Sequence, residues 1–327
     1  MANVGQGFLS HLGFGEEINY GTAVARPYFV EINSESISKE SEIIETNAIT
    51  RRGIINLRVA PGAKRISGDI EFDAQYGGWL KLAKHSFGQI DTSSPDPTNA
   101  PTARRHRFTI ADSLPTGLTM ELYRDNSSFV TEPNKAFVYA GCKINTMEFS
   151  CGVDEILKVG VGIMGQDESR ATKTATNFAT DPLAVYHQGK LTWNTTELEV
   201  EQFSIQINNN LEARPKLNSR VTREPRPSDQ IEVTGTFMTE FVSWAEYDDF
   251  LNASERVMVV TFTGPLIAGS TYKQIILTAN VAIMRNNGAR VVLDSPGRLK
   301  IEHEFKCYRS ASANELVLDV INTETGI

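Results

Sequence analysis

Cysteine is scarce in this sequence, and long apolar runs are missing. Three cysteines occur among the 327 residues (Cys142, Cys151 and Cys307), and none belongs to a C-x-x-C motif. A disulfide scaffold and a zinc knuckle are therefore excluded as organising principles. No apolar run approaches the ~20 residues that span a bilayer, and the first dozen residues lack the pattern of a signal peptide. We expect a soluble protein made in a reducing cytoplasm.

Basic residues are also in deficit. The chain has 32 Lys and Arg against 40 Asp and Glu, which gives a formal net charge of −8. A general affinity for nucleic acid or an anionic membrane needs a cationic surface, so this charge balance argues against both. Apolar residues make up 40% and charged residues 22% of the chain, a balance that supports a folded core. The length fits either one or two domains.

Recognisable catalytic motifs are missing as well. Residues 160–165 match G-x-G-x-x-G by letter, but they lie in a predicted strand with no amphipathic helix after it, so no dinucleotide is expected. Glu197, Glu199 and Glu201 are predicted to share the solvated face of one strand, and the basic cluster 104–107 to form salt bridges. The histidines lack metal-ligand spacing; they are His11, His85, His106, His187 and His303. We predict no enzymatic activity, no cofactor and no metal.

Most readable segments alternate between apolar and polar residues with a period of two. Examples are 66–73, 118–122, 231–241 and 299–305. This alternation is typical of antiparallel strands with one packed and one solvated face. Only 76–86 and 243–253 have a good helical pattern, and each contains a tryptophan. We predict a mainly β protein in which Trp79 and Trp244 anchor two short helices to their sheets.

The two helices mark a weak internal repeat. Ile66-Ser-Gly-Asp-Ile precedes the first helix as Val233-Thr-Gly-Thr-Phe precedes the second, and Leu157-Lys-Val is matched later by Leu299-Lys-Ile. Because the order strand, helix, strand, hairpin, strand is the same in both halves, we predict two antiparallel β-sandwich or barrel domains from an internal duplication. The predicted division is an N-terminal β-domain (1–168), a linker (169–190) and a C-terminal β-domain (191–327).

Two long polar segments, 38–65 and 208–230, occupy corresponding places in the two halves. Connections of this length inside a domain are usually functional or disordered. Both segments are too polar to pack inside their own domain, so we expect extended arms that are mobile in the free chain and ordered by a partner. The charged candidates for these contacts are Arg51, Arg52, Arg214, Lys216, Arg220, Arg223, Glu224 and Arg226.

Several motifs, taken in order, resemble one known family. They are Gly15-Glu-Glu-Ile-Asn-Tyr-Gly-Thr22, Tyr28-Phe-Val-Glu31, Ser34-Glu-Ser-Ile37, Ile66-Ser-Gly-Asp-Ile-Glu-Phe72, Tyr76-Gly-Gly-Trp-Leu80, Phe203-Ser-Ile-Gln-Ile-Asn-Asn209, Thr222-Arg-Glu224 and Val233-Thr-Gly-Thr-Phe237. Each motif alone carries little information. Their order and spacing over about residues 13–320 resemble those of the siphophage major tail proteins, which form the tail tube.

The resemblance implies a structural virion protein without enzymatic activity. Such a subunit stacks as rings into a tail tube, and the inner sheets of neighbouring subunits join around the channel for DNA ejection. Two tail-tube-type domains per chain imply either trimeric rings with pseudo-sixfold character or hexameric rings. The two arms then become inter-ring arms, because they are the segments free to reach a neighbouring ring.

The same resemblance implies the partners and the location. The chain contacts other copies of itself, the tape measure protein, the tail terminator and the distal tail protein, while viral DNA passes through the lumen without specific binding. It resides in the virion tail and is made in the host bacterial cytoplasm.

Two other functions remain open at this point. A capsid or head-decoration protein is also β-rich, although it does not need duplicated long arms. A carbohydrate-binding β-sandwich adhesion module requires a row of exposed aromatic residues, whereas the three tryptophans of this chain are spread along the sequence.

Overall fold

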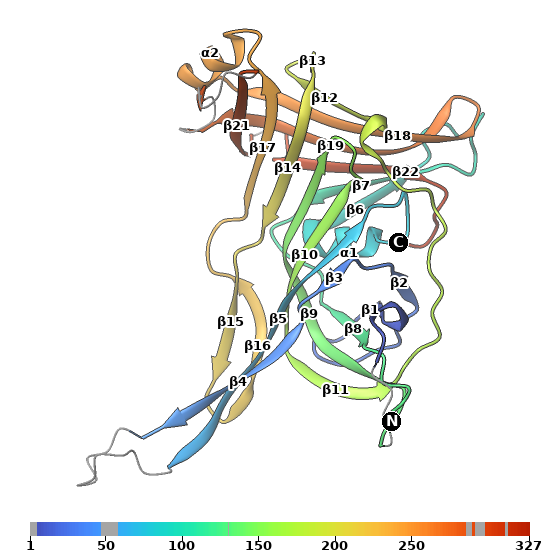
Figure 1. Ribbon diagram of the computed structural model, residues 1–327, viewed down its shortest axis with the longest axis vertical. Helices are drawn as coiled ribbons and strands as arrows, with labels where there is room; N and C mark the ends of the chain where they lie inside the picture. Colours follow the sequence, from blue (N-terminus) through green and yellow to red (C-terminus); the bar gives the residue numbers. More distant parts are fainter. Residues whose placement is uncertain (1–4, 47–57, 130, 286–289, 292–297, 311–312) are drawn as a thin grey trace.

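Strands make up most of the computed structural model, which describes residues 5–46, 58–129, 131–285, 290–291, 298–310 and 313–327 (Figure 1). The first half contains η1 (Gly7–Leu9), β1 (His11–Glu16), β2 (Tyr28–Val30), β3 (Ser34–Glu35), β4 (Ser38–Glu45), β5 (Val59–Asp73), α1 (Leu80–Phe87), β6 (Gly88–Ser93), β7 (Arg104–Ile110), β8 (Leu118–Tyr123), β9 (Lys135–Gly152), β10 (Lys158–Gly165) and β11 (Asp167–Thr172).

The second half continues the same pattern of many strands and one α-helix. It contains η2 (Tyr186–Gln188), β12 (Gly189–Trp193), β13 (Thr196–Leu198), β14 (Val200–Asn208), β15 (Leu211–Lys216), β16 (Ser219–Pro227), β17 (Glu232–Glu240), α2 (Ala245–Leu251), β18 (Arg256–Ala268), β19 (Thr271–Met284), β20 (Arg290–Val291), β21 (Lys300–Cys307) and β22 (Leu316–Asn322). The mainly β prediction is confirmed. Both helices are shorter than predicted, and Gly78, with φ of 86°, makes the turn from which α1 begins.

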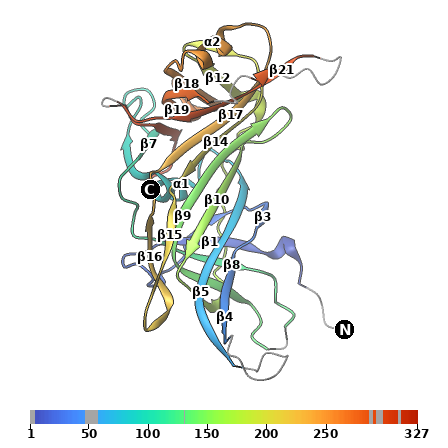
Figure 2. The same ribbon diagram turned by 90° about the vertical axis from the view of Figure 1, so that its left-hand side faces the viewer.

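One wide antiparallel sheet runs through both halves of the chain. Its strand order is β4, β5, β10, β9, β14, β17 and β21, and Figure 2 shows it face on. The junction between the halves is the β9–β14 pair, in which Phe149 lies opposite Ile205 and Cys151 opposite Phe203. Alternate residues of these strands are buried, as the period of two requires.

A second layer also combines strands of both halves, in the order β6, β7, β22, β19, β18, β12 and β13. The end of β19 pairs with β21 and so connects this layer to the wide sheet. A smaller sheet of β2, β1, β8, β9 and β11 belongs to the first half. Strand β9 serves two sheets because it bends at Gly141, whose φ of 67° favours glycine.

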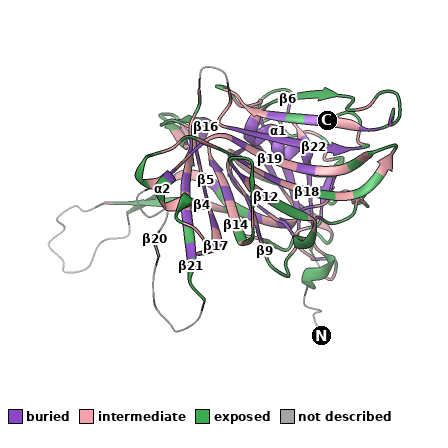
Figure 3. Ribbon diagram, turned by 90° about the horizontal axis from the view of Figure 1, so that it is seen from above, coloured by how far each residue is buried: buried purple, intermediate pink, exposed green. Residues whose placement is uncertain are grey.

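The buried side chains of both halves form one hydrophobic core between the layers (Figure 3). Phe72 and Phe149 from the first half belong to the same core as Phe237 and Phe305 from the second. The expected linker runs along the first half, where Leu183 and Val185 form bridges with Gln75 and Ile156. The predicted linker 169–190 separates the two halves in the sequence. In the structure, the sheets and the core contain residues from both halves.

Trp79 lies in the centre of this core, just before α1. Its side chain is 1% exposed, and its ring centroid lies 5.9 Å from that of Phe149 and 6.3 Å from that of Phe72. The indole Nε1 donates a hydrogen bond of 2.7 Å to the carbonyl oxygen of Gln75. The ring therefore connects the start of α1 with two strands of the wide sheet.

Trp244 differs from the expectation of a buried anchor. Its side chain is 63% exposed and packs edge-on against Phe241 at 5.0 Å and Tyr247 at 5.7 Å, both of them next to or within α2. Helix α1 lies against β6, β7 and β9, whereas α2 has its main strand contact with β19 alone. The local pattern around the two tryptophans is similar, but α2 has too little tertiary cover to bury its ring.

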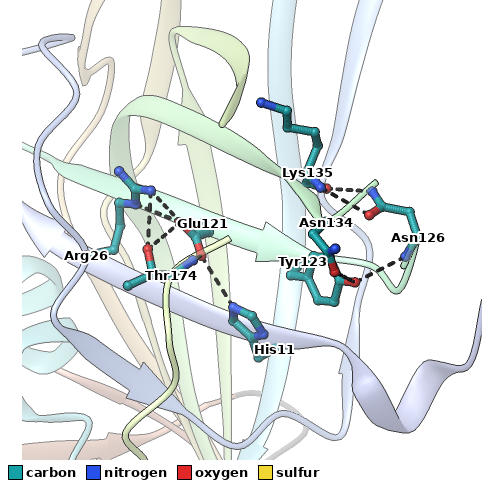
Figure 4. Close-up of polar contacts among 8 residues, drawn as sticks. All are labelled: His11, Arg26, Glu121, Tyr123, Asn126, Asn134, Lys135 and Thr174. Carbon is teal, nitrogen blue, oxygen red and sulfur yellow. Dashed lines mark hydrogen bonds and ion pairs between the residues drawn. The ribbon is translucent and has the colours of Figure 1, made fainter. Parts of the chain in front are cut away.

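A buried carboxylate fixes the loops around the small sheet (Figure 4). Glu121 on β8 is fully buried and accepts hydrogen bonds from Arg26 Nε at 2.9 Å, Thr174 N at 2.7 Å and Thr174 Oγ1 at 2.9 Å. His11 Nε2 lies 3.3 Å from the same carboxylate. Burial alone would raise the pKa of Glu121, but the bonds from His11, Thr174 and Arg26 outweigh it and lower the pKa to about 2.

The two tryptophans supply a matched pair of variants for the core. We expect Trp79→Ala to reduce the free energy of unfolding by about 3–5 kcal/mol, as other truncations of core aromatics do. Trp244→Ala should cost less than about 1 kcal/mol, because its ring is mostly solvated already. Denaturant unfolding of the unassembled subunit measures both values, and equal losses would contradict the assignment of Trp79 as the core residue.

Glu121 should make the fold sensitive to acid. Its pKa is lower in the folded chain than its ordinary value of 4.5, so its stabilising contribution is present above pH 4.5 and is lost as the pH falls towards 2. Glu121→Gln should lower stability at neutral pH and make the decline below pH 4.5 shallower. Exposed Glu302 supplies the control Glu302→Gln. The account fails if thermal unfolding of Glu121→Gln across this pH range follows the unsubstituted chain.

Candidate assembly surfaces

The residues that the structure describes contain no group of His, Cys, Asp and Glu that could hold a metal ion. The G-x-G-x-x-G residues 160–165 lie within β10, paired on both sides with β5 and β9, as predicted. Cys142, Cys151 and Cys307 are buried, and this burial raises the pKa of each thiol.

The basic cluster 104–107 has a structural role. It lies on β7 rather than in a loop, and the side chains of Arg105 and Arg107 both bond Asp319 on β22, at distances of 2.6–3.0 Å. Burial of Asp319 raises its pKa, but the two guanidinium groups more than compensate and lower it. The predicted salt bridges are confirmed, and they reinforce the antiparallel pairing of β7 with β22.

The prediction that Glu197, Glu199 and Glu201 share one strand is wrong. Strand β13 ends at Leu198 and β14 begins at Val200, so the chain breaks its alternation between them. Glu197 forms an ion pair with Lys190, and Glu201 forms one of 2.5 Å with Lys300. Glu197 and Glu201 therefore have lysine partners, and Glu199 is exposed between them.

The outward face of the wide sheet is polar and predominantly acidic, and we call it the acidic face. The strand registers place one set of alternating residues on it, opposite to the buried set. Its nine carboxylates are Glu40, Asp69, Glu71, Asp73, Glu148, Glu232, Glu240, Glu302 and Glu304, and its cations are Arg65, Lys158, Lys300 and Lys306.

Small uncharged side chains separate these charges. Gly160 and Gly162 on β10, Ser204 on β14 and Thr234 and Thr236 on β17 face the same way. Aromatic side chains of these strands, such as those of Phe149 and Phe237, belong to the buried set. The acidic face is thus exposed to solvent and continuous across the β9–β14 junction, and it is hollowed near Glu71, Glu148 and Gly160. Sequence analysis missed it because the junction joins segments more than 50 residues apart.

The two predicted arms are β-hairpins, β4–β5 and β15–β16, that project together from the lower left of the molecule in Figure 1. Arg220 connects them, because its Nε donates a hydrogen bond of 2.8 Å to the carbonyl oxygen of Gly62 and its Nη2 one of 2.9 Å to Ser41 Oγ. Glu224 forms an ion pair of 2.6 Å with Lys143 on β9. The arms are therefore regular hairpins that contact one another, rather than irregular loops.

The candidate arm residues fall into two groups. Arg220 and Glu224 bond within the chain, as described. Four cations on the second hairpin have no ion pair within the described part of the chain, and these are Arg214, Lys216, Arg223 and Arg226. Arg51 and Arg52 lie outside the described residues. Cations without an ion pair on a projecting hairpin are suited to contacts with an acidic surface of another molecule.

Comparison with known proteins supplies the family. No curated protein matches the chain. A family model described as phage tail tube protein matches residues 7–307, which is nearly the whole chain. The match includes the wide sheet, both hairpins and most of the second layer. No helix among the described residues is long and apolar enough to cross a membrane. The chain belongs to the phage tail tube protein family, as the motifs in its sequence indicated.

Proposed function

We propose that copies of this chain stack as rings into a tail tube whose channel is lined by the acidic face. The observation that supports this proposal most directly is one sheet that extends through both halves of the chain. One face of this sheet is buried, and the other is exposed to solvent. A wall around a water-filled channel requires such a sheet, since its inner face must remain solvated while its outer face is packed.

The strand order supports an internal duplication. In the first half the order is β4, β5, β10 and β9, and in the second it is β14, β17 and β21, followed by β19 and β20 at the edge. One strand of each set, β5 or β17, is followed by an α-helix. Leu157-Lys-Val at the start of β10 corresponds to Leu299-Lys-Ile at the start of β21.

This correspondence suggests how a ring closes. Within the chain, β14 of the second set pairs with β9 of the first set. By the same geometry, β3 and β4 of one chain would dock beside β19 and β20 of the preceding chain. Three chains would then supply six strand sets around the axis, and the ring would be trimeric with pseudo-sixfold character.

The charge of the acidic face suits the passage of DNA. Nine carboxylates against three lysines and one arginine repel phosphates, so a duplex passing through the channel finds few anchoring cations. The DNA would therefore move without specific binding. The tape measure protein, tail terminator and distal tail protein are the further partners, and the virion tail, assembled from chains made in the host bacterial cytoplasm, is the location that this function requires.

Neither alternative function has a specific observation in its favour. A capsid or head-decoration role gives no reason for two paired, projecting hairpins. A carbohydrate-binding module needs a planar row of exposed aromatics, whereas Trp244 and its neighbours gather at the end of the molecule around α2.

The ring should contain three chains. Mass per unit length of purified tubes, measured by scanning transmission electron microscopy and divided by the ring spacing in the same tubes, gives the number of 36.2 kDa chains per ring. We expect three. A value of six would show that one strand set per chain faces the channel and would overturn the trimer.

Excision of the second hairpin should separate folding from stacking. Ser228 N donates a hydrogen bond of 2.9 Å to the carbonyl oxygen of Asn210, so deleting residues 211–227 leaves two ends that already meet. The loss of the Glu224–Lys143 pair should cost about 1–3 kcal/mol and leave a folded subunit. Tubes should no longer elongate.

Negative-stain microscopy and circular dichroism measure the two properties. A matched control removes the exposed turn between β18 and β19 instead. The stacking role of the hairpin is wrong if the chain without 211–227 forms tubes of normal length and thermal stability.

A further inference from the structure

The tip of the β15–β16 hairpin carries an isolated, fully accessible apolar side chain. Leu217 is 95% exposed and stands in the turn between the two strands. Lys216 precedes it, and Arg214 lies two residues further back, opposite Arg223 in the strand register. An exposed leucine flanked by cations that have no ion pair among the described residues offers both apolar surface and positive charge to a partner.

A cavity of about 510 Å³ lies among β12, β13, β14, the end of β9 and β18. About half of its lining is apolar, and this part is formed by Leu191, Leu198, Val200, Phe203, Val260 and Phe262. This volume is typical of protein pockets that bind drug-sized groups, so it is able to receive a hairpin turn. The wall residues at its mouth are only partly buried, which leaves apolar surface accessible from outside.

The mouth of this cavity is acidic. Glu197, Glu199 and Glu201 all line it. Lys190 and Lys300 neutralise the first and the third. Glu199 is exposed and has no ion pair within the described residues. The cavity therefore combines one apolar wall with a carboxylate, Glu199, that has no ion pair among the described residues, and this combination complements the hairpin tip.

The two features lie at opposite ends of the molecule. Figure 1 places β12 and β13 at the top of the longest axis and the tip of β15–β16 in the lower part, and Figure 2 shows the same separation. A chain cannot bring its own tip to its own cavity without unfolding the wide sheet. A second copy displaced along this axis presents the tip of one chain to the cavity of the next.

We infer that Leu217 of a chain in one ring inserts into this cavity of a chain in the adjacent ring, with Lys216 beside Glu199. This inference rests on the proposed stacking of rings and identifies the contact that holds them. Burial of the leucine supplies attraction, and the charge pair sets the direction of stacking. The contact runs from hairpin tip to cavity and leaves a free tip at one end of the tube, so it propagates without limit.

Cross-linking in preformed tubes tests the contact directly. The variant carries Leu217→Cys and Glu199→Cys in a Cys151→Ser background, because Cys151 also borders the cavity. Because both substitutions weaken the proposed contact, the variant is assembled at a concentration well above the one at which the unsubstituted chain forms tubes. Treatment with a short bis-maleimide should give a denaturant-resistant ladder of two, three and more chains, since each chain links to the one above and the one below.

The controls separate this contact from others. Each single-cysteine variant should give no ladder. A matched variant pairs Leu217→Cys with Leu251→Cys, because Leu251 is 60% exposed on α2 at the same end of the molecule. A ladder that forms with Leu251 and fails with Glu199 overturns the cavity assignment in favour of α2, and tubes without any ladder overturn the tip contact. Unsubstituted chains that form no tubes refute the proposed function instead.

A second variant measures the contribution of the apolar contact. Leu217→Asp places a carboxylate beside the acidic rim and removes the buried leucine. We expect an unchanged thermal unfolding curve for the free subunit and a rise of about tenfold or more in the concentration needed for tube growth. Tube growth at the unsubstituted concentration would contradict the inference.

Discussion

The pairing of β9 with β14 is the contact on which the rest of this structure depends. It joins seven backbone positions, from Gln202 opposite Gly152 to Asn208 opposite Thr146, between segments that the sequence places in different halves. Without it the molecule would contain two narrow sheets with exposed edges, which are prone to uncontrolled pairing. With it the buried faces of both halves form one core, and the opposite faces form one acidic surface.

In the assembly that we propose, this pairing is the template for ring closure. The junction between the two strand sets would fix the spacing and twist of the next set, so that neighbouring chains would meet as the two halves of one chain meet. Stacking requires contacts in a different direction, and in our proposal the hairpins that leave the sheet at its lower edge would supply them.

Local features were predictable from the sequence because short-range patterns determine them. Alternation around Ile66 and Ile70 predicted β5, and the apolar positions around Leu80 and Leu82 predicted α1. The basic cluster 104–107 was correctly interpreted as structural, although its partner Asp319 is more than 200 residues away. Asp319, like the strands that pair with β7 and β9, is brought into contact by the fold. The spacing of residues along the sequence does not indicate such distant partners.

The failures have the same origin. Trp79 and Trp244 occur in similar amphipathic segments, and only the cover supplied by β6, β7 and β9 makes one of them a core residue. The segments 38–65 and 208–230 were predicted to be arms from their length and polarity, and this role stays a prediction. Their hairpin form was missed because their strands lack the apolar alternation that usually indicates strands. Leu217 was detectable as the single large aliphatic residue in the polar stretch 212–220.

The central claim is that the acidic face lines the channel, and a reconstruction of assembled tubes by electron cryomicroscopy without imposed symmetry tests it most directly. The side chains of Glu148 and Thr236, from the two halves, should both point towards the tube axis at the same radius. The account is contradicted if the map places this face on the outside of the tube or between rings, or if only one half reaches the lumen.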